Sequence, residues 1–186
     1  MCLCCIIKTV NGRCICQLAK LIAGQIATPQ ATGGSSKVRW KSNFAGSGIP
    51  METRRQGAIM KICGLQKTTL LDYPGRVACT VFTGGCNFRC PFCHNASLVL
   101  DQDNHTSVLA EDFFSFLRKR RGILDGVCIT GGEPLLQRDI ADFLYQVKSL
   151  GYEVKLDTNG SFPHCLKELV RKGLVDYVAM DIKSSP

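Results

Sequence analysis

Apolar and polar residues after residue 60 follow two alternating periods, which predict parallel strands joined by helices. Residues 76–82 are an apolar, β-branched run and are interpreted as the first strand. Further strands are expected at 126–130, 152–156 and 175–182. Helical spacing of apolar residues predicts helices between residues 107 and 122, between 140 and 151, and at 165–172. Residues 60–71 are expected to form only a short segment before the first strand.

Four strands with three helices between them predict an α/β fold, since each unit is long enough for a right-handed crossover. The sequence stops at Pro186, directly after the fourth strand. A parallel strand at an open edge exposes apolar surface and unpaired backbone groups, so an α/β domain rarely ends there. We therefore expect the chain to be a fragment, or a further portion to be supplied elsewhere.

Residues 1–59 differ in composition from the rest. Of the 23 basic and 15 acidic residues in the chain, eight basic and one acidic lie in this segment, which leaves 15 and 14 in residues 60–186. The predicted domain is thus close to neutral, and no nucleic-acid partner is expected. The segment also has five of the 12 cysteines and a Gly/Ser-rich stretch at 29–50. We predict that residues 1–59 are a disordered or non-native leader and that residues 60–186 are the domain. A flexible tail, a metal-binding tract and a targeting peptide are the alternatives.

No apolar run in the sequence is long enough to span a membrane, so no membrane partner is expected.

Cys86, Cys90 and Cys93 form a C-x3-C-x2-C pattern directly after the first predicted strand. Three thiolates on a Gly-rich loop can converge on one iron–sulfur cluster. A four-iron cluster takes four ligands, so one iron would keep an open position, as in catalytic metal sites. A zinc site that adds His94 and an ordinary ferredoxin cluster remain alternatives. The other cysteines after residue 60 are expected in the core, namely Cys63, Cys79, Cys128 and Cys165.

Small and polar residues also follow the other predicted strands. They are GGEP at 131–134, DTNG at 157–160 and DIK at 181–183. Each of the first two is by itself a common turn sequence. Because ligands of parallel α/β proteins bind beside the carboxyl ends of the strands, their succession with the cysteine loop predicts one shared site.

With these residues the chain resembles the radical S-adenosylmethionine (SAM) superfamily. The resemblance extends from Met60 to Pro186 and rests on the C-x3-C-x-aromatic-C form, with Phe92 as the aromatic residue. Within the superfamily it is similar to the activating enzymes of glycyl-radical proteins, in particular those of anaerobic ribonucleoside-triphosphate reductase. The resemblance implies a partial (βα) barrel of the radical SAM type, truncated here after the fourth of six usual strands, and it supports Met60 as the natural start.

The resemblance also implies a site. Cys86, Cys90 and Cys93 would hold three irons of a [4Fe-4S] cluster, and the fourth iron would bind the amino and carboxylate groups of SAM. Phe92 would lie near the adenine, and the backbone of residues 131–134 would receive the methionine end. The implied cofactor-binding residues are Phe92, Gly131, Gly132, Glu133, Pro134, Asp157, Thr158, Asp181 and Lys183. Of these, Glu133 would also bond the amino group, Asp157, Thr158 and Asp181 would hold a monovalent cation, and Lys183 would contact the cofactor.

The implied activity is reductive cleavage of SAM to methionine and a 5′-deoxyadenosyl radical, which takes a hydrogen atom from a glycine of a partner enzyme. The implied partners are a large glycyl-radical enzyme, namely anaerobic ribonucleotide reductase, and a flavodoxin- or ferredoxin-type electron donor. An anaerobic, cytoplasmic setting is expected, and no side chain is expected to act as acid or base. The alternatives are a radical SAM enzyme acting on a small molecule or RNA, and a non-enzymatic iron–sulfur or zinc module.

Overall fold

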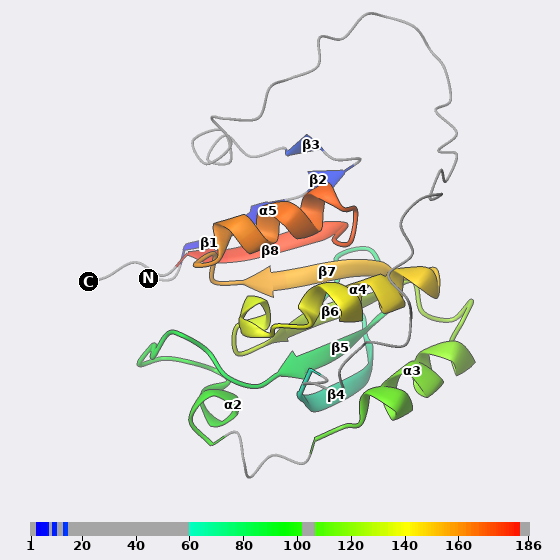
Figure 1. Cartoon of the computed structure of the whole chain (residues 1–186), viewed down its shortest axis with the longest axis horizontal. Coiled ribbons are helices and arrows are strands. Elements are labelled where there is room, and N and C mark those ends of the chain that lie inside the picture. The colour runs from blue at the N-terminus through cyan, green and yellow to red at the C-terminus, as the bar shows by residue number, and fades with distance from the viewer. Residues whose placement is uncertain (1–2, 8, 11–12, 15–59, 102–106, 183–186) are drawn as a thin grey trace, which may run out of the picture.

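The computed structural model describes residues 3–7, 9–10, 13–14, 60–101 and 107–182. In this part of the chain, six strands form one sheet in the order β1-β8-β7-β6-β5-β4 (Figure 1). Strands β5 to β8 are parallel, whereas β4 and β1 are antiparallel edge strands. The strands are β1 (Leu3–Ile7), β4 (Ile62–Thr69), β5 (Ala78–Thr83), β6 (Gly126–Gly131), β7 (Glu153–Thr158) and β8 (Tyr177–Ile182). A separate pair comprises β2 (Thr9–Val10) and β3 (Arg13–Cys14).

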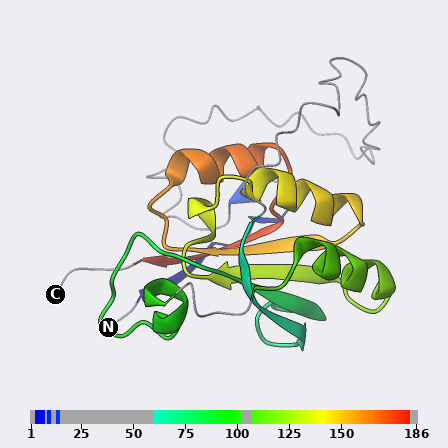
Figure 2. The ribbon, with the colours of Figure 1, turned by 60° about the horizontal axis from the view of Figure 1, so that its bottom comes forward.

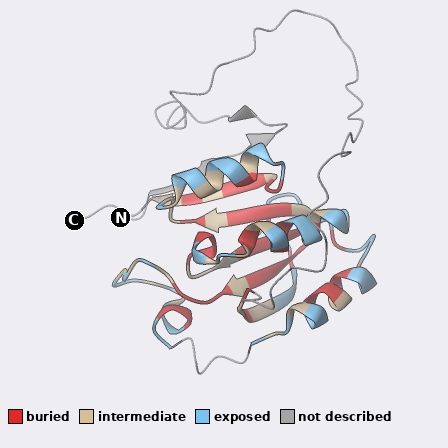
Figure 3. Ribbon diagram, in the orientation of Figure 1, coloured by how far each residue is buried: buried red, intermediate tan, exposed pale blue. Residues whose placement is uncertain are grey.

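Three amphipathic helices pack against one face of the sheet, namely α3 (Ala110–Lys119), α4 (Ile140–Ser149) and α5 (Pro163–Arg171). Figure 2 shows this arrangement for α4 and α5. Alternate residues of the central strands and the apolar faces of the helices form one core, which contains the stacked rings of Phe113 and Phe143. The helices are exposed on their outer sides, while the central strands are largely buried (Figure 3). The other helical elements among the described residues are α2 (Ala96–Leu100) and the 3-10 turn η2 (Pro134–Leu136).

The opposite face of the sheet is more polar. Thr80, Cys128, Lys155 and Tyr177 are paired in register across β5, β6, β7 and β8, so they form one row on this face. The ring of Tyr73, from the loop between β4 and β5, packs against that of Tyr177 on this face, with 5.8 Å between the ring centres. This face of the sheet therefore supplies polar side chains beside the carboxyl ends of the parallel strands.

The predicted α/β alternation is confirmed, since each predicted strand and helix has a counterpart. Two expectations were wrong. Residues 62–69 are a strand, β4, rather than a connecting segment, because their backbone pairs with β5. Strand β8 does not lie at an open edge, because residues 3–7 pair with it as β1. The division of the chain at residue 60 stays a prediction, since residues 15–59 lie outside the described residues.

Candidate functional site

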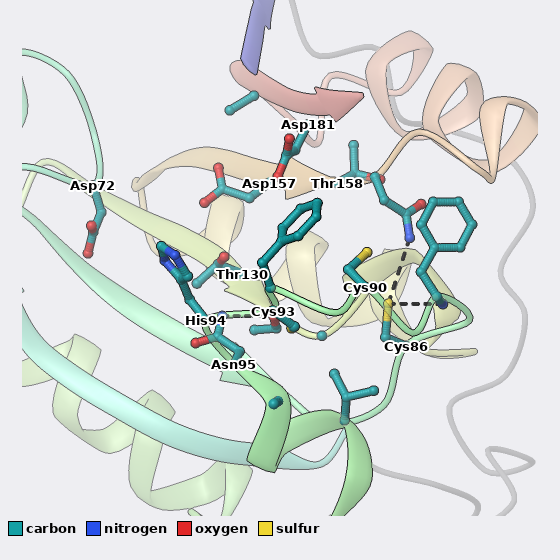
Figure 4. A pocket seen from close by; sticks show the side chains of 18 of the residues that line it. Asp72, Cys86, Cys90, Cys93, His94, Asn95, Thr130, Asp157, Thr158 and Asp181 are labelled. Atoms are coloured by element: carbon teal, nitrogen blue, oxygen red, sulfur yellow. Dashed lines mark hydrogen bonds between the residues drawn. The ribbon is translucent and has the colours of Figure 1, made fainter. Parts of the chain in front are cut away.

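The carboxyl ends of β5 to β8 surround one cavity of about 780 Å³ (Figure 4). The loop after β5 supplies one wall, and the ends of β6, β7 and β8 supply the other. Of the residues expected from the sequence, the cavity is lined by Cys86, Cys90, Phe92, Cys93, Gly131, Gly132, Asp157, Thr158 and Asp181. Glu133 and Pro134 are not among its lining residues, and Lys183 lies outside the described residues. One site thus gathers most of the predicted set.

The cysteine loop presents three thiols to the cavity. Cys86, Cys90 and Cys93 are free and partly exposed. The loop is folded locally, because Arg89 donates to the Cys86 carbonyl at 2.6 Å and the Cys93 amide donates to the Cys90 carbonyl at 3.2 Å. Among the described residues, no three His, Cys, Asp or Glu side chains are grouped around a single metal position. Thiolates are the ligands of iron–sulfur clusters. Three thiols on one loop at one cavity are suited to bind one iron each of a single cluster.

Gly131, the last residue of β6, and Gly132, which follows it, allow the end of β6 to contact the segment after β5. A Cβ atom on Gly132 would lie 1.8 Å from the carbonyl oxygen of Gly85, and Gly131 has a φ of +113°. The Gly132 amide donates to the Thr83 carbonyl at 2.9 Å, and the next amide donates to the Gly85 carbonyl at 2.8 Å. The need for glycine here follows from contact with the start of the cysteine loop, with no cofactor required.

Glu133 is fully buried and its carboxylate is bonded within the protein. It accepts hydrogen bonds from the Leu135 amide at 3.1 Å, the Thr158 hydroxyl at 2.8 Å and the Asn159 amide at 2.7 Å. Burial raises the pKa of this carboxyl, and the three hydrogen bonds oppose the rise. The side chain therefore ties the end of β6 to the end of β7, whereas Gly131 and Gly132 line the cavity.

Asp157 and Asp181 lie next to each other on the cavity wall, from the neighbouring strands β7 and β8 (Figure 4). The Asp157 carboxylate forms an ion pair with Lys155, and it lies 3.6 Å from the Cys128 sulfur. Lys155 is buried, and its ammonium group also lies 3.6 Å from that sulfur. Cys128 was expected in an apolar core; it is buried, but on the polar face.

Lys155, Asp72 and Asn159 also line the cavity. Sequence reasoning missed Lys155 and Asp72, and it included Asn159 only as part of the DTNG turn at 157–160. Lys155 occupies an inward position of β7 between Glu153 and Asp157, and the strand's period of two was the signal that could have identified it. Asp72 comes from the β4–β5 loop, where the Thr80 hydroxyl donates to it. No sequence pattern connects that loop to the strand ends.

Among the described residues, no helix is both long and apolar enough to cross a membrane.

Comparison with known proteins identifies the matched region and its relatives. Residues 80–186 match the family model of the radical SAM superfamily. A candidate glycyl-radical enzyme activating enzyme of Methanocaldococcus jannaschii is 36% identical over 126 residues, 66% of this chain and 50% of that protein. A pyruvate formate-lyase-activating enzyme of Listeria monocytogenes is 33% identical over 123 residues, 61% of this chain and 49% of that protein. The solved structure of QueE from Escherichia coli matches with a TM-score of 0.46 and 19% identity, over 55% of this chain and 53% of that one.

The chain spans about half the length of the curated relatives it matches. The matched family region nevertheless covers more than half of the chain and includes the cysteine loop and all the strand ends around the cavity. The chain therefore belongs to the radical SAM superfamily, and this membership implies a [4Fe-4S] cluster and SAM as its cofactors.

Proposed function

We propose that the protein cleaves SAM reductively on a [4Fe-4S] cluster held by Cys86, Cys90 and Cys93, and that it generates a glycyl radical on a partner enzyme. The observation that carries this proposal is the cavity at which all three thiols meet the ends of β6, β7 and β8. The relatives named as activating enzymes support the choice of a glycine as the site of hydrogen abstraction.

Different residues of the cavity would have different roles. The three cysteines would hold the cluster, and the backbone at Gly131 and Gly132 would receive the methionine end of SAM. When bound, the reduced cluster supplies the electron that splits SAM into methionine and a 5′-deoxyadenosyl radical. The cavity walls would hold the reacting atoms in place. No acid or base is needed for hydrogen-atom transfer.

The wall opposite the cysteine loop would face the carboxylate of SAM. Asp157, Thr158 and Asp181 are proposed to hold a monovalent cation there, and Phe92 to lie against the adenine. Asp157 and Asp181 line the cavity with carboxylate oxygens, which suit a hard cation. Lys155 already neutralises part of this charge through its ion pair with Asp157, so the site is expected to bind a cation weakly without SAM.

The proposed partner is anaerobic ribonucleotide reductase, with a flavodoxin or ferredoxin as electron donor and the cytoplasm of an anaerobically growing cell as the setting. The likeness of the stretch from Met60 to Asn95 to the activating proteins of that reductase supports this choice. The relative from Listeria acts on pyruvate formate-lyase by its name, so that lyase is the comparison partner in any test.

Anaerobic reconstitution of the 186-residue chain with iron and sulfide, followed by electron paramagnetic resonance (EPR), tests the cluster and its open iron. We expect a [4Fe-4S] spectrum that changes when SAM is added. Replacing Cys86, Cys90 or Cys93 by Ala should abolish it, while Cys165→Ala, at a cysteine outside the cavity lining, should not. A spectrum that does not change when SAM is added would refute the proposal, and so would a metal analysis that finds zinc and no iron.

The partner is tested by mixing the reduced, reconstituted chain and SAM with each candidate partner. A glycyl-radical EPR signal on the reductase, absent with pyruvate formate-lyase, is the expected result. Production of 5′-deoxyadenosine without a glycyl radical on either partner would contradict the activating role and leave cleavage of SAM intact.

A further inference from the structure

A side-chain amide from the turn after β7 reaches the sulfur of one predicted cluster ligand. The Nδ2 atom of Asn159 lies 3.8 Å from Cys86 Sγ, within hydrogen-bonding distance for sulfur. The backbone amide of Phe88 donates to the same sulfur at 3.4 Å. Figure 4 draws the hydrogen bonds at Cys86. One of these two donors comes from the cysteine loop itself, and the other comes from a different strand end.

The orientation of the Asn159 amide is fixed by its neighbours. The backbone amide of Ser161 donates to Asn159 Oδ1 at 2.9 Å. A backbone N–H can only donate, so the oxygen must lie on that side and the NH2 group must face Cys86. The second hydrogen of the NH2 group has an acceptor as well, because Asn87 Oδ1 lies 3.0 Å from Nδ2.

Contacts with buried residues hold the turn that carries Asn159 in place. The Asn159 backbone amide donates to the buried carboxylate of Glu133, which also accepts the Thr158 hydroxyl. Gly160 continues the turn with a φ of +77°, and a Cβ atom there would lie 2.9 Å from the sulfur of Met180. The donor is thus fixed by protein contacts alone, before any cofactor binds.

We propose that Asn159 is a positioning residue for the Cys86 thiolate and that its N–H group raises the reduction potential of the cluster. A donor directed at a ligating sulfur stabilises the additional negative charge of the reduced cluster, and hydrogen bonds to the sulfurs are among the determinants of cluster potential. The inference rests on the proposed function, because it requires Cys86 to ligate a cluster.

The test is the midpoint potential of the reconstituted 186-residue chain, measured by EPR-monitored redox titration without SAM. In Asn159→Ala we expect the equilibrium constant for reduction to fall roughly tenfold, which is about 59 mV for a one-electron couple. Asn159→Asp keeps an acceptor for the Ser161 amide but loses the donor, and its carboxylate adds negative charge, so the potential should fall at least as far.

Ser161→Ala is the matched control. Its hydroxyl lies in the same turn and donates to Asn159 Oδ1 at 2.6 Å, but the amide that faces Cys86 remains. We expect the wild-type potential in this variant. Iron content and circular dichroism are measured for every variant, and a folded Asn159→Ala chain that retains less iron than Ser161→Ala also supports the positioning role.

Two results would overturn the inference. The first is a wild-type potential and iron content in both Asn159 variants. The second is an equal shift in Ser161→Ala, which would assign the effect to the shape of the turn. A wild-type chain that takes up no cluster would overturn the proposed function itself, so the two failures are distinguishable.

Discussion

Replacement of Gly132 by Ala adds a single methyl group at the closest contact between two strand ends. The new Cβ atom would lie 1.8 Å from the Gly85 carbonyl oxygen and 2.6 Å from its carbonyl carbon. Both are backbone atoms, so no side chain can rotate away to make room. The end of β6 and the start of the cysteine loop must therefore move apart.

That movement breaks the two hydrogen bonds that join these segments, from the Gly132 amide to Thr83 and from the Glu133 amide to Gly85. A hydrogen bond contributes about 1 kcal/mol net, and a buried group left without a partner costs about 1–3 kcal/mol. We expect Gly132→Ala to lower the free energy of unfolding by about 2–4 kcal/mol, a large share of the 5–15 kcal/mol typical of a domain.

Gly151→Ala separates this steric effect from backbone strain. Gly151 has a φ of +92°, but no described atom lies within 4 Å of a Cβ built there. The left-handed conformation should cost this variant about 1–2 kcal/mol. Gly64→Ala, whose nearest atom would be a Phe82 side-chain carbon at 3.4 Å, should be the mildest.

Denaturant titration of the metal-free chain, followed by circular dichroism under anaerobic conditions, measures all three variants. The expected order of destabilisation is Gly132→Ala, then Gly151→Ala, then Gly64→Ala. A Gly132→Ala chain as stable as Gly151→Ala would refute the reasoning, since it would show that the end of β6 and the start of the cysteine loop are not in contact as described.

Burial and charge elsewhere give three more expected outcomes. Burial raises the pKa of Glu133 above its ordinary 4.5, so its contribution to stability falls as pH rises through the folded-state pKa, and Glu133→Gln should flatten that part of the pH profile of unfolding. Burial raises the pKa of Cys79 to about 12 and also raises that of Cys128, so mass spectrometry after brief alkylation should find both unmodified while the loop cysteines react. The hydrogen bond from Arg76 lowers the pKa of Glu153, whose stabilisation is present above pH 4.5 and lost on acidification. This pair is partly exposed, so Glu153→Gln should cost at most about 1 kcal/mol, less at high salt, by denaturant titration.

The sequence predicted the central strands and the helices because their apolar periods are long and regular. It did not predict β4, whose residues 62–69 include a glycine and an exposed polar run and have no regular alternation. It also did not predict β1, because the pairing of residues 3–7 with β8 joins segments almost the whole chain apart. The local pattern of apolar and polar residues contains no information about a pairing partner so far away along the chain.

The candidate site was predicted in outline for a topological reason. Parallel strands bring their carboxyl ends to one edge, so the cysteines, Gly131 and Asp157 had to lie near one another. The roles of individual side chains could not be predicted in the same way. Whether Glu133 faces the cavity or the protein interior depends on the dihedral angles of a turn, and whether Lys155 meets Asp157 depends on side-chain conformation.

The contacts of Glu133 change how mutations at this site should be interpreted. Its carboxylate holds Thr158 and Asn159, and Asn159 in turn reaches Cys86, so one buried group connects the ends of β6 and β7 with the cysteine loop. Loss of activity on replacing any of these residues would not by itself identify a contact with SAM. A true contact lowers SAM affinity at unchanged iron content, whereas a support of the loop changes iron content or potential first. Measuring both quantities on each variant separates residues that bind the cofactor from residues that hold its ligands in place.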